Sequence, residues 1–328
     1  MSLRWGILST ARIAQTQFLP ALQGQTQHQV LAIASRDAAR AEQVAGAFGI
    51  PRAYGSYEAL LADPEIEAIY LPLPNSLHAE WTIRALQAGK HVLCEKPVAR
   101  RAAEAERMVA TARANGVLLM EAFMWRHHAQ QARVRALLDG GAIGQPTVIR
   151  ASFGFPLDPE SSNVRLRADL EGGSLMDVGC YPVNFARWVF GAEPVRVSGQ
   201  QVLDPRLGVD MAFGGVLVFA GGRLALIDSN FRHASRQHAE IAGTEGVLTM
   251  ELPFRPDAAP GRIEVVRGGQ RQVEEVPAEN QYTRQADHFA QSIAAGRLLE
   301  PAEDGVAQAR AIEALYASAA GRPGPDSG

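Results

Sequence analysis

The sequence predicts an α/β protein with two domains: a doubly wound parallel sheet, then an α+β domain built on a large, mostly antiparallel open sheet. Through residue 122, short apolar runs alternate with amphipathic helical patterns, which is typical of a parallel sheet with right-handed crossovers. From residue 147 onward, β-rich runs separated by short turns predominate, as in antiparallel sheets. We therefore place the domains at 1–122 and 123–328.

The first domain is predicted to contain six strands. They are 3–8, 30–34, 53–54, 68–71, 91–94 and 117–122, and the helices between them are 11–24, 38–48, 57–61, 77–88 and 101–115. Ser56 is a candidate N-cap, and Gly49 ends a helix with Pro51 beyond it. Because the carboxyl ends of parallel strands share one sheet edge, the loops after these strands meet where ligands bind.

The second domain is predicted to be mostly strand. Its strands are 147–155, 195–202, 211–219, 223–231, 238–242, 247–252, 262–266 and 272–276, and its helices are 126–138, 175–190, 281–295 and 303–319. The strands at 211–219 and 223–231 are apolar on more than one side. Monomers rarely expose large apolar patches, so we expect one sheet face to pack against a second copy, in a homodimer or homotetramer.

Composition excludes several classes of protein. The net charge of -3 gives no basic surface for nucleic acid, and no apolar run is long enough to span a membrane. The chain enters a strand within its first residues, which is unlike a signal peptide. Cys94 and Cys180 both lie in apolar contexts, so we expect no disulfide and a cytoplasmic protein.

The turn after the first strand is related to a dinucleotide-binding fingerprint. It reads Gly6-Ile-Leu-Ser9-Thr-Ala11-Arg-Ile-Ala14, with Ser9 and Ala11 in place of two glycines. Small side chains still let a pyrophosphate approach the helix N-terminus, although an ordinary tight turn is the alternative. A Rossmann domain is therefore expected, with cofactor contacts from Ser9, Thr10, Ala11, Arg12 and Ile13.

The end of the second strand predicts which cofactor binds. It reads Ser35-Arg36-Asp37. An acidic residue there holds the ribose 2′-hydroxyl of NAD, whereas an arginine suits the 2′-phosphate of NADP. We predict NADP, bound by Ser35 and Arg36, with NAD as the alternative because Asp37 follows.

Two further motifs carry candidate catalytic groups. Glu95-Lys96-Pro97 follows the fifth strand, which aims Lys96 into the cofactor crevice at the sheet edge. Asp177 and Tyr181 are four residues apart in the helix at 175–190, so they share one face. The alternative for Tyr181 is a buried helix tyrosine, and for Asp177 a charge that complements the helix dipole.

With these motifs the chain resembles, over nearly its whole length, the family of glucose–fructose oxidoreductase, inositol 2-dehydrogenase and rhizopine-catabolism oxidoreductases (Gfo/Idh/MocA). The resemblance rests on the segments 73–78, 88–97, 172–182 and 241–246. The segments 3–7, 53–58 and 120–123 look closest to the dimeric dihydrodiol dehydrogenase and NADP-dependent D-xylose dehydrogenase branch. The inositol branch has histidine in place of Tyr181, which argues against a standard inositol dehydrogenase.

The resemblance implies roles for individual residues. Lys96 matches the lysine near the nicotinamide ribose and substrate, Tyr181 matches the catalytic histidine or tyrosine, and Asp177 its acidic partner. Cofactor contacts are implied for Glu95 and for the loop that borders the nicotinamide half, which contains Leu73, Pro74, Asn75 and His78.

The chemistry of these groups favours an NADP(H)-dependent oxidoreductase. A phenol with a pKa of about 10 is a poor base at neutral pH, but a nearby lysine ammonium lowers that pKa. Tyr181 would then exchange the substrate proton during hydride transfer at a secondary alcohol, ketone or hemiacetal of a sugar, polyol or small cyclic diol. The alternatives are a non-catalytic NADP sensor and an enzyme that uses bound cofactor for transient oxidation.

Residues after the sixth strand suggest a substrate pocket. Trp125 and Arg126 follow that strand, and Trp125 with Phe153 is expected to form an apolar wall, or else to belong to an interdomain core. His127 and His128 suggest a metal site only superficially, because no carboxylate or cysteine partner has suitable spacing. We expect no metal.

Overall fold

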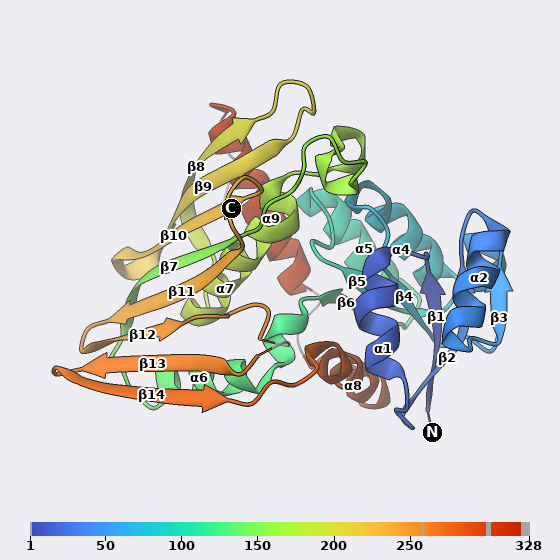
Figure 1. Ribbon diagram of the computed structural model, residues 1–328, viewed down its shortest axis with the longest axis horizontal. Coiled ribbons are helices and arrows are strands. Elements are labelled where there is room, and N and C mark those ends of the chain that lie inside the picture. The colour runs from blue at the N-terminus through green and yellow to red at the C-terminus, as the bar shows by residue number, and fades with distance from the viewer. Residues whose placement is uncertain (1, 257–258, 300–302, 323–328) are drawn as a thin grey trace. The chain divides into compact units, whose positions relative to one another are not determined.

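The computed structural model describes residues 2–256, 259–299 and 303–322 (Figure 1). The chain divides into two compact units, Met1–Met124 with Tyr282–Val306, and Trp125–Gln281 with Ala307–Gly328. The division at 124/125 lies two residues from the expected boundary. Residues 282–306 differ from the expectation, because they cluster with the first unit instead of the second.

The first unit contains the expected parallel sheet. Its order is β3-β2-β1-β4-β5-β6, and the described strands of this sheet all pair in parallel. The strands are β1 (Leu3–Leu8), β2 (His28–Ala34), β3 (Arg52–Tyr54), β4 (Ala68–Leu71), β5 (His91–Glu95) and β6 (Leu119–Ala122). This order reverses direction between β1 and β4, which is where doubly wound sheets bind nucleotides.

The helices of the first unit follow the predicted order. They are α2 (Ala38–Phe48), α3 (Tyr57–Leu61), α4 (His78–Gln87), preceded by the short turn η2 (Asn75–Leu77), and α5 (Ala102–Ala114). The helix expected at 11–24 is a π turn, η1 (Ala14–Phe18), followed by α1 (Leu19–Leu22). Ser56 caps α3 by accepting from Ala59 N–H at 3.2 Å, and Gly49 ends α2 at φ +66°.

Helix α8 (Gln281–Ala294) explains why residues 282–306 belong to the first unit. Asp287 pairs with His28 of β2 at 2.9 Å, and the Phe289 ring lies 5.8 Å from that of Trp5. Thr283 Oγ1 donates to the carbonyl of Ala21 at 2.8 Å. The helical pattern predicts α8 itself, but these partners lie in the N-terminal third of the chain, so local sequence cannot reveal them.

The second unit contains an open sheet in the order β14-β13-β12-β11-β7-β10-β9-β8. Among the described strands of this sheet only β7 and β10 pair in parallel, so the expected mostly antiparallel sheet is confirmed. The strands are β7 (Pro146–Gly154), β8 (Pro194–Leu203), β9 (Asp210–Phe219), β10 (Arg223–Asn230), β11 (Arg236–Gly243), β12 (Gly246–Met250), β13 (Gly261–Arg267) and β14 (Gln270–Val276).

Helices cover one face of this sheet (Figure 1). They are α6 (Ala129–Asp139), α7 (Cys180–Phe190) and α9 (Glu303–Ala319). The helix expected at 175–190 begins with a π turn, η6 (Leu175–Gly179), and continues as α7. A Cβ at Gly179 would lie 2.8 Å from Ser229 Oγ of β10, so glycine permits this close approach of helix to sheet. The short turns are η3 (Met124–His127), η4 (Val164–Leu166), η5 (Ala168–Leu170) and η7 (Ala220–Gly222).

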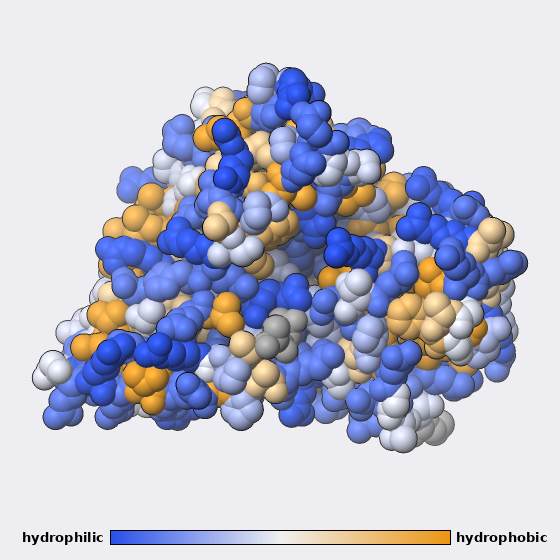
Figure 2. All heavy atoms as spheres, viewed as in Figure 1, coloured by the Kyte–Doolittle hydropathy of each residue, from blue (hydrophilic) through white to orange (hydrophobic). Residues whose placement is uncertain are grey.

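The sheet of the second unit also carries exposed apolar residues. Val216 and Leu226, which face each other across β9 and β10, are 37% and 40% exposed. Their strand neighbours Leu217 and Ile227 are buried, as alternation in a strand requires. Figure 2 shows hydrophobic residues scattered among hydrophilic ones over these strands. Among the described residues, no helix combines the length and apolarity needed to cross a membrane.

Candidate active site

The turn after β1 is closed by its own side chains. Ser9 Oγ accepts from Ala11 N–H at 3.0 Å, and Gln15 Nε2 donates to the carbonyl of Thr10 at 2.8 Å. Ser9 has φ +150°, a conformation that favours glycine. The serine therefore occupies a glycine-type backbone position of the fingerprint. A helical turn starts at Arg12, at the carboxyl end of β1.

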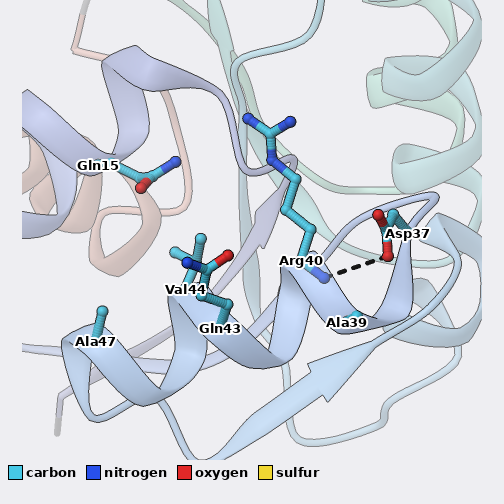
Figure 3. Close-up of a pocket in the computed structure, with 7 residues that line it drawn as sticks. All are labelled: Gln15, Asp37, Ala39, Arg40, Gln43, Val44 and Ala47. Carbon is cyan, nitrogen blue, oxygen red and sulfur yellow. Dashed lines mark hydrogen bonds between the residues drawn. The ribbon is translucent and has the colours of Figure 1, made fainter.

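The turn after β2 separates the roles of its two charged residues. Asp37 is the N-cap of α2, and its carboxylate accepts from Arg40 N–H at 3.3 Å (Figure 3). Ser35 Oγ accepts from Asp37 N–H at 3.2 Å. Arg36 is exposed at the same turn. The carboxylate thus caps the helix, and it is less available to accept a hydrogen bond from a ribose hydroxyl.

Tyr57 interacts with both of these turns, and it is not among the cofactor-binding residues predicted from the sequence. The residue is 7% exposed, and its ring packs edge-on against Trp81, with 4.8 Å between centroids. Burial raises the pKa of Tyr57, while the charge of Arg36 and side-chain hydrogen bonds with Ser9 and Arg36 lower that pKa. Local sequence shows Tyr57 only as the residue after an N-cap, because its partners follow β1 and β2.

A groove of about 480 Å³ borders the same region, within the size range of small-molecule sites. Figure 3 shows Gln15 facing α2 across the groove, with the Arg40 guanidinium extended away from that helix. The lining residues are Gln15, Asp37, Ala39, Arg40, Gln43, Val44 and Ala47. None of them belongs to the predicted cofactor set, although Asp37 directly follows Arg36. The groove therefore adjoins the predicted cofactor residues without containing them.

The Glu95-Lys96-Pro97 loop is held at the carboxyl end of β5. Glu95 Oε1 accepts from the Tyr70 hydroxyl at 2.6 Å, and Oε2 accepts from Lys96 N–H at 3.3 Å. The Lys96–Pro97 peptide bond is cis, and Lys96 itself is half-buried. These contacts fix the backbone from which the lysine side chain projects.

His78 connects the loop at 73–78 to the Glu-Lys-Pro loop. Its Nε2 lies 2.8 Å from the Leu73 carbonyl oxygen and its Nδ1 lies 2.9 Å from that of Pro97. The residue is 1% exposed, and this burial lowers the pKa of the imidazole. Both ring nitrogens thus face backbone oxygens. Leu73 is buried as well, whereas Pro74 and Asn75 are half-buried before and at the start of η2.

The second unit carries the predicted Asp177 and Tyr181. Asp177 lies in the π turn η6, and Tyr181 is the second residue of α7. Asp177 Oδ2 accepts from Arg165 Nε at 2.6 Å. The Tyr181 ring packs edge-on against Phe153, with 5.3 Å between centroids. Arg165, which lies in η4, is a partner that sequence reasoning missed.

The predicted pocket residues gather around another residue that was missed. Phe254 is buried and lies 5.6 Å from Phe153, 5.5 Å from Tyr181 and 5.9 Å from Trp125 between ring centroids. Trp125 is fully buried and also contacts two rings of α7. The Arg126 guanidinium lies 6.0 Å from the Trp125 ring. Phe254 follows β12 in an irregular segment, where no periodic pattern points to it.

The histidine pair after β6 has a structural use. His128 Nδ1 accepts from Gln130 N–H at 3.0 Å and so caps α6. Within the described ranges, no group of three or more His, Cys, Asp or Glu side chains is placed to hold a metal ion.

Comparison with protein families matches both parts of the chain. Residues 3–123 match the oxidoreductase family with an NAD-binding Rossmann fold, and residues 131–249 match the GFO/IDH/MocA C-terminal domain. The first match covers the whole parallel sheet, and the second includes η6 and α7.

Individual relatives extend the likeness along most of the chain. D-xylose 1-dehydrogenase (NADP(+)) 2 of Haloferax volcanii is 39% identical over 96% of this chain and 97% of its own length. Trans-1,2-dihydrobenzene-1,2-diol dehydrogenase of Xenopus laevis is 39% identical over 76% of this chain and 75% of its own. The 3-ketoreductase KijD10 of Actinomadura kijaniata, crystallised with NADP and TDP-benzene, superposes with a TM-score of 0.92. It is 36% identical over 97% of this chain and 98% of its own.

Proposed function

The chain belongs to the Gfo/Idh/MocA family of NAD-binding oxidoreductases, and from this membership we propose that it is an NADP(H)-dependent dehydrogenase or reductase of sugars, polyols or small cyclic diols. The observation that carries the proposal is Lys96 at the carboxyl end of β5, because parallel sheets bind ligands at that edge. Relatives named for D-xylose and for a dihydrodiol suggest this range of substrates.

The residues after β1 and β2 fit NADP better than NAD. Arg36 supplies a fixed positive charge beside Tyr57, whose side chain also interacts with Ser9, and such a charge suits the 2′-phosphate. Asp37 is engaged as the cap of α2. The contacts that we propose for the cofactor come from Ser9, Thr10, Ala11, Arg12, Ile13, Ser35, Arg36, Leu73, Pro74, Asn75, His78, Glu95 and Lys96.

We assign the proton chemistry to three side chains. When bound, NADP would supply the hydride acceptor or donor for the reaction. Tyr181, as the phenolate, takes the proton of the substrate hydroxyl and returns it in the reverse reaction. The ammonium of Lys96 favours that phenolate, and Asp177 orients the substrate hydroxyl. Trp125, Arg126 and Phe153 contribute to the substrate pocket in this proposal.

A screen of cofactor and substrate together tests the proposal. NADPH formation is followed by absorbance over aldoses including D-xylose, inositols and trans-diols, and the screen is repeated with NAD. We expect turnover with NADP and at least one of these alcohols. Stable NADP binding without turnover across the panel would instead favour a cofactor sensor. Cofactor that stays bound through gel filtration with no net redox change would favour transient oxidation.

We also propose that the chain forms a homodimer or homotetramer through the exposed face of its second sheet. Val216 and Leu226 are adjacent there and considerably exposed, and exposed apolar side chains that lie together favour association. Repeating one surface on two copies gives a closed two-fold interface.

A further inference from the structure

Arg165 forms an ion pair with the proposed catalytic carboxylate. Its Nε donates to Asp177 Oδ2 at 2.6 Å, which is at the short end for a charge-assisted hydrogen bond. The Asp177 side chain is 13% exposed and that of Arg165 is 38% exposed. Water and salt reach the guanidinium end of the pair, which limits its contribution to stability, whereas the carboxylate is largely enclosed by the protein. The ion pair therefore fixes one oxygen of a largely buried carboxylate.

The backbone of Arg165 is fixed against the start of η6. Arg165 N–H donates to Asn163 Oδ1 at 3.1 Å, and its carbonyl accepts from Gly173 N–H at 2.9 Å. A Cβ at Gly172 would lie 2.3 Å from that carbonyl oxygen. The glycine pair before the helix thus makes room for the Arg165 backbone, and any larger residue at Gly172 would displace it.

The start of η6 is fixed from its other side by strand β9. Asp210 Oδ2 accepts from Leu175 N–H at 2.7 Å and from Ser174 Oγ at 2.8 Å. A Cβ at Gly173, where φ is +118°, would lie 2.1 Å from Asp210 Oδ1. Asp210 is buried, and the Tyr316 hydroxyl of α9 donates to it at 2.8 Å. Arg165 and Asp177 are consequently held in one local frame.

From this arrangement we propose that Arg165 is a positioning residue that fixes the orientation of the Asp177 carboxylate for proton and hydride transfer. The inference rests on the proposed function of Asp177. A carboxylate that can rotate about its side-chain bonds presents its oxygens to a substrate hydroxyl in many orientations. A guanidinium that binds the carboxylate restricts it to one of these orientations. A misplacement of about 1 Å in a reacting geometry can cost about 10²-fold in rate.

A double-mutant cycle tests the proposal in the full-length protein. The variants are Arg165→Gln, Asp177→Asn and their combination, assayed with NADP and the fastest alcohol of the screen above, beginning with D-xylose. We expect Arg165→Gln to lower kcat by roughly 10–100-fold with little change in the KM for NADP. In the Asp177→Asn background the same substitution should cause no further loss, since its effect passes through Asp177.

Further variants separate positioning from structural support. Arg165→Lys keeps a cation and should recover part of kcat, and guanidinium ion added to Arg165→Ala should do the same. Arg167→Gln is the matched control, because Arg167 pairs with Asp169 on the surface two residues away, and it should leave kcat unchanged. Arg165→Gln should melt close to the wild-type temperature.

A crystal structure of Arg165→Gln provides a readout that needs no substrate. We expect the Asp177 side chain to leave the orientation that it has beside Arg165. An unchanged carboxylate, a wild-type kcat for Arg165→Gln, or an equal loss in the Asp177→Asn background would overturn the inference. If Asp177→Asn itself keeps full turnover, both the inference and the proposed role of Asp177 fail. If Asp177→Asn is impaired but Arg165→Gln is not, only the inference fails.

Discussion

The hydroxyl of Tyr70 donates a 2.6 Å hydrogen bond to Oε1 of Glu95. Tyr70 lies on β4 and is fully buried, and its ring stacks on Phe18 with 3.8 Å between centroids. Glu95 ends β5, and its second oxygen accepts from Lys96 N–H. The backbone that carries Lys96 is therefore tied to the core of the first unit through the neighbouring strand.

Tyr70→Phe should loosen that backbone. The substitution removes one hydrogen bond to a partly exposed carboxylate, so we expect the free energy of unfolding to fall by about 1 kcal/mol. We also expect kcat to fall by several-fold, because the backbone that carries the Lys96 side chain is held less firmly. Denaturant unfolding and steady-state kinetics measure the two effects.

Tyr54→Phe is the control for Tyr70→Phe. The Tyr54 hydroxyl donates to Asp63 at 2.9 Å, and β3 lies at the sheet edge, with three strands between it and β5. This variant should lose comparable stability and keep wild-type kcat. Equal kcat in the two variants would show that the Tyr70–Glu95 bond serves stability alone.

Tyr181→Phe and Lys96→Ala test the proposed proton transfer directly. Each should lower kcat by roughly 10²–10⁴-fold, since a placed acid/base group contributes about that much. NADP affinity, measured by quenching of protein fluorescence, should change little for Tyr181→Phe. Full turnover in either variant would contradict the proposed mechanism.

Tyr57→Phe tests the 2′-phosphate site. Loss of the phenolic hydroxyl beside Ser9 and Arg36 should weaken binding of NADP by roughly tenfold, equivalent to about 1.4 kcal/mol. Binding of NAD should stay the same, because NAD has no 2′-phosphate. Calorimetry with 2′,5′-ADP and with 5′-AMP makes the comparison without turnover, and an equal loss for both fragments would count against a phosphate contact.

The burial of His78 predicts how stability depends on pH. Burial lowers the pKa of folded His78 below its ordinary value of 6.5, so in acid the unfolded chain binds a proton that the folded chain does not. Stability should therefore fall as the pH decreases below about 6.5. His78→Gln should make this slope shallower, by up to about 1.4 kcal/mol per pH unit.

Urea unfolding between neutral and mildly acid pH measures this slope. Part of it should remain in His78→Gln, because burial also lowers the pKa of His91. An identical slope in the wild type and the variant would show that His78 is protonated equally in both states.

Leu226→Arg tests association through the second sheet. The charge would lie beside Val216 on the proposed association face, so we expect the mass by light scattering at micromolar concentration to fall to that of the monomer. Leu299→Arg is the control, because Leu299 is similarly exposed, at 42% against 40%, but lies in the first unit. A monomeric wild type would rule out the interface.

The sequence by itself determined the order and type of nearly every element. Alternating apolar runs and helical patterns placed the parallel strands, and glycine-rich turns separated the later ones, because these signals depend on residues close together in the chain. It also located the turns after β1, β2 and β5 as candidate sites, since the topology brings the ends of parallel strands to one edge. The assigned roles of Lys96, Asp177 and Tyr181 stay predictions.

Only the tertiary structure decided which side chains meet. The pairing of Arg165 with Asp177, the position of Tyr57 beside Arg36 and the packing of Phe254 on Tyr181 join segments that are not neighbours in sequence. The membership of α8 in the first unit likewise depends on His28 and Trp5. Local periodicity specifies which face of an element is buried, but the partner of that face is fixed only when the whole chain packs.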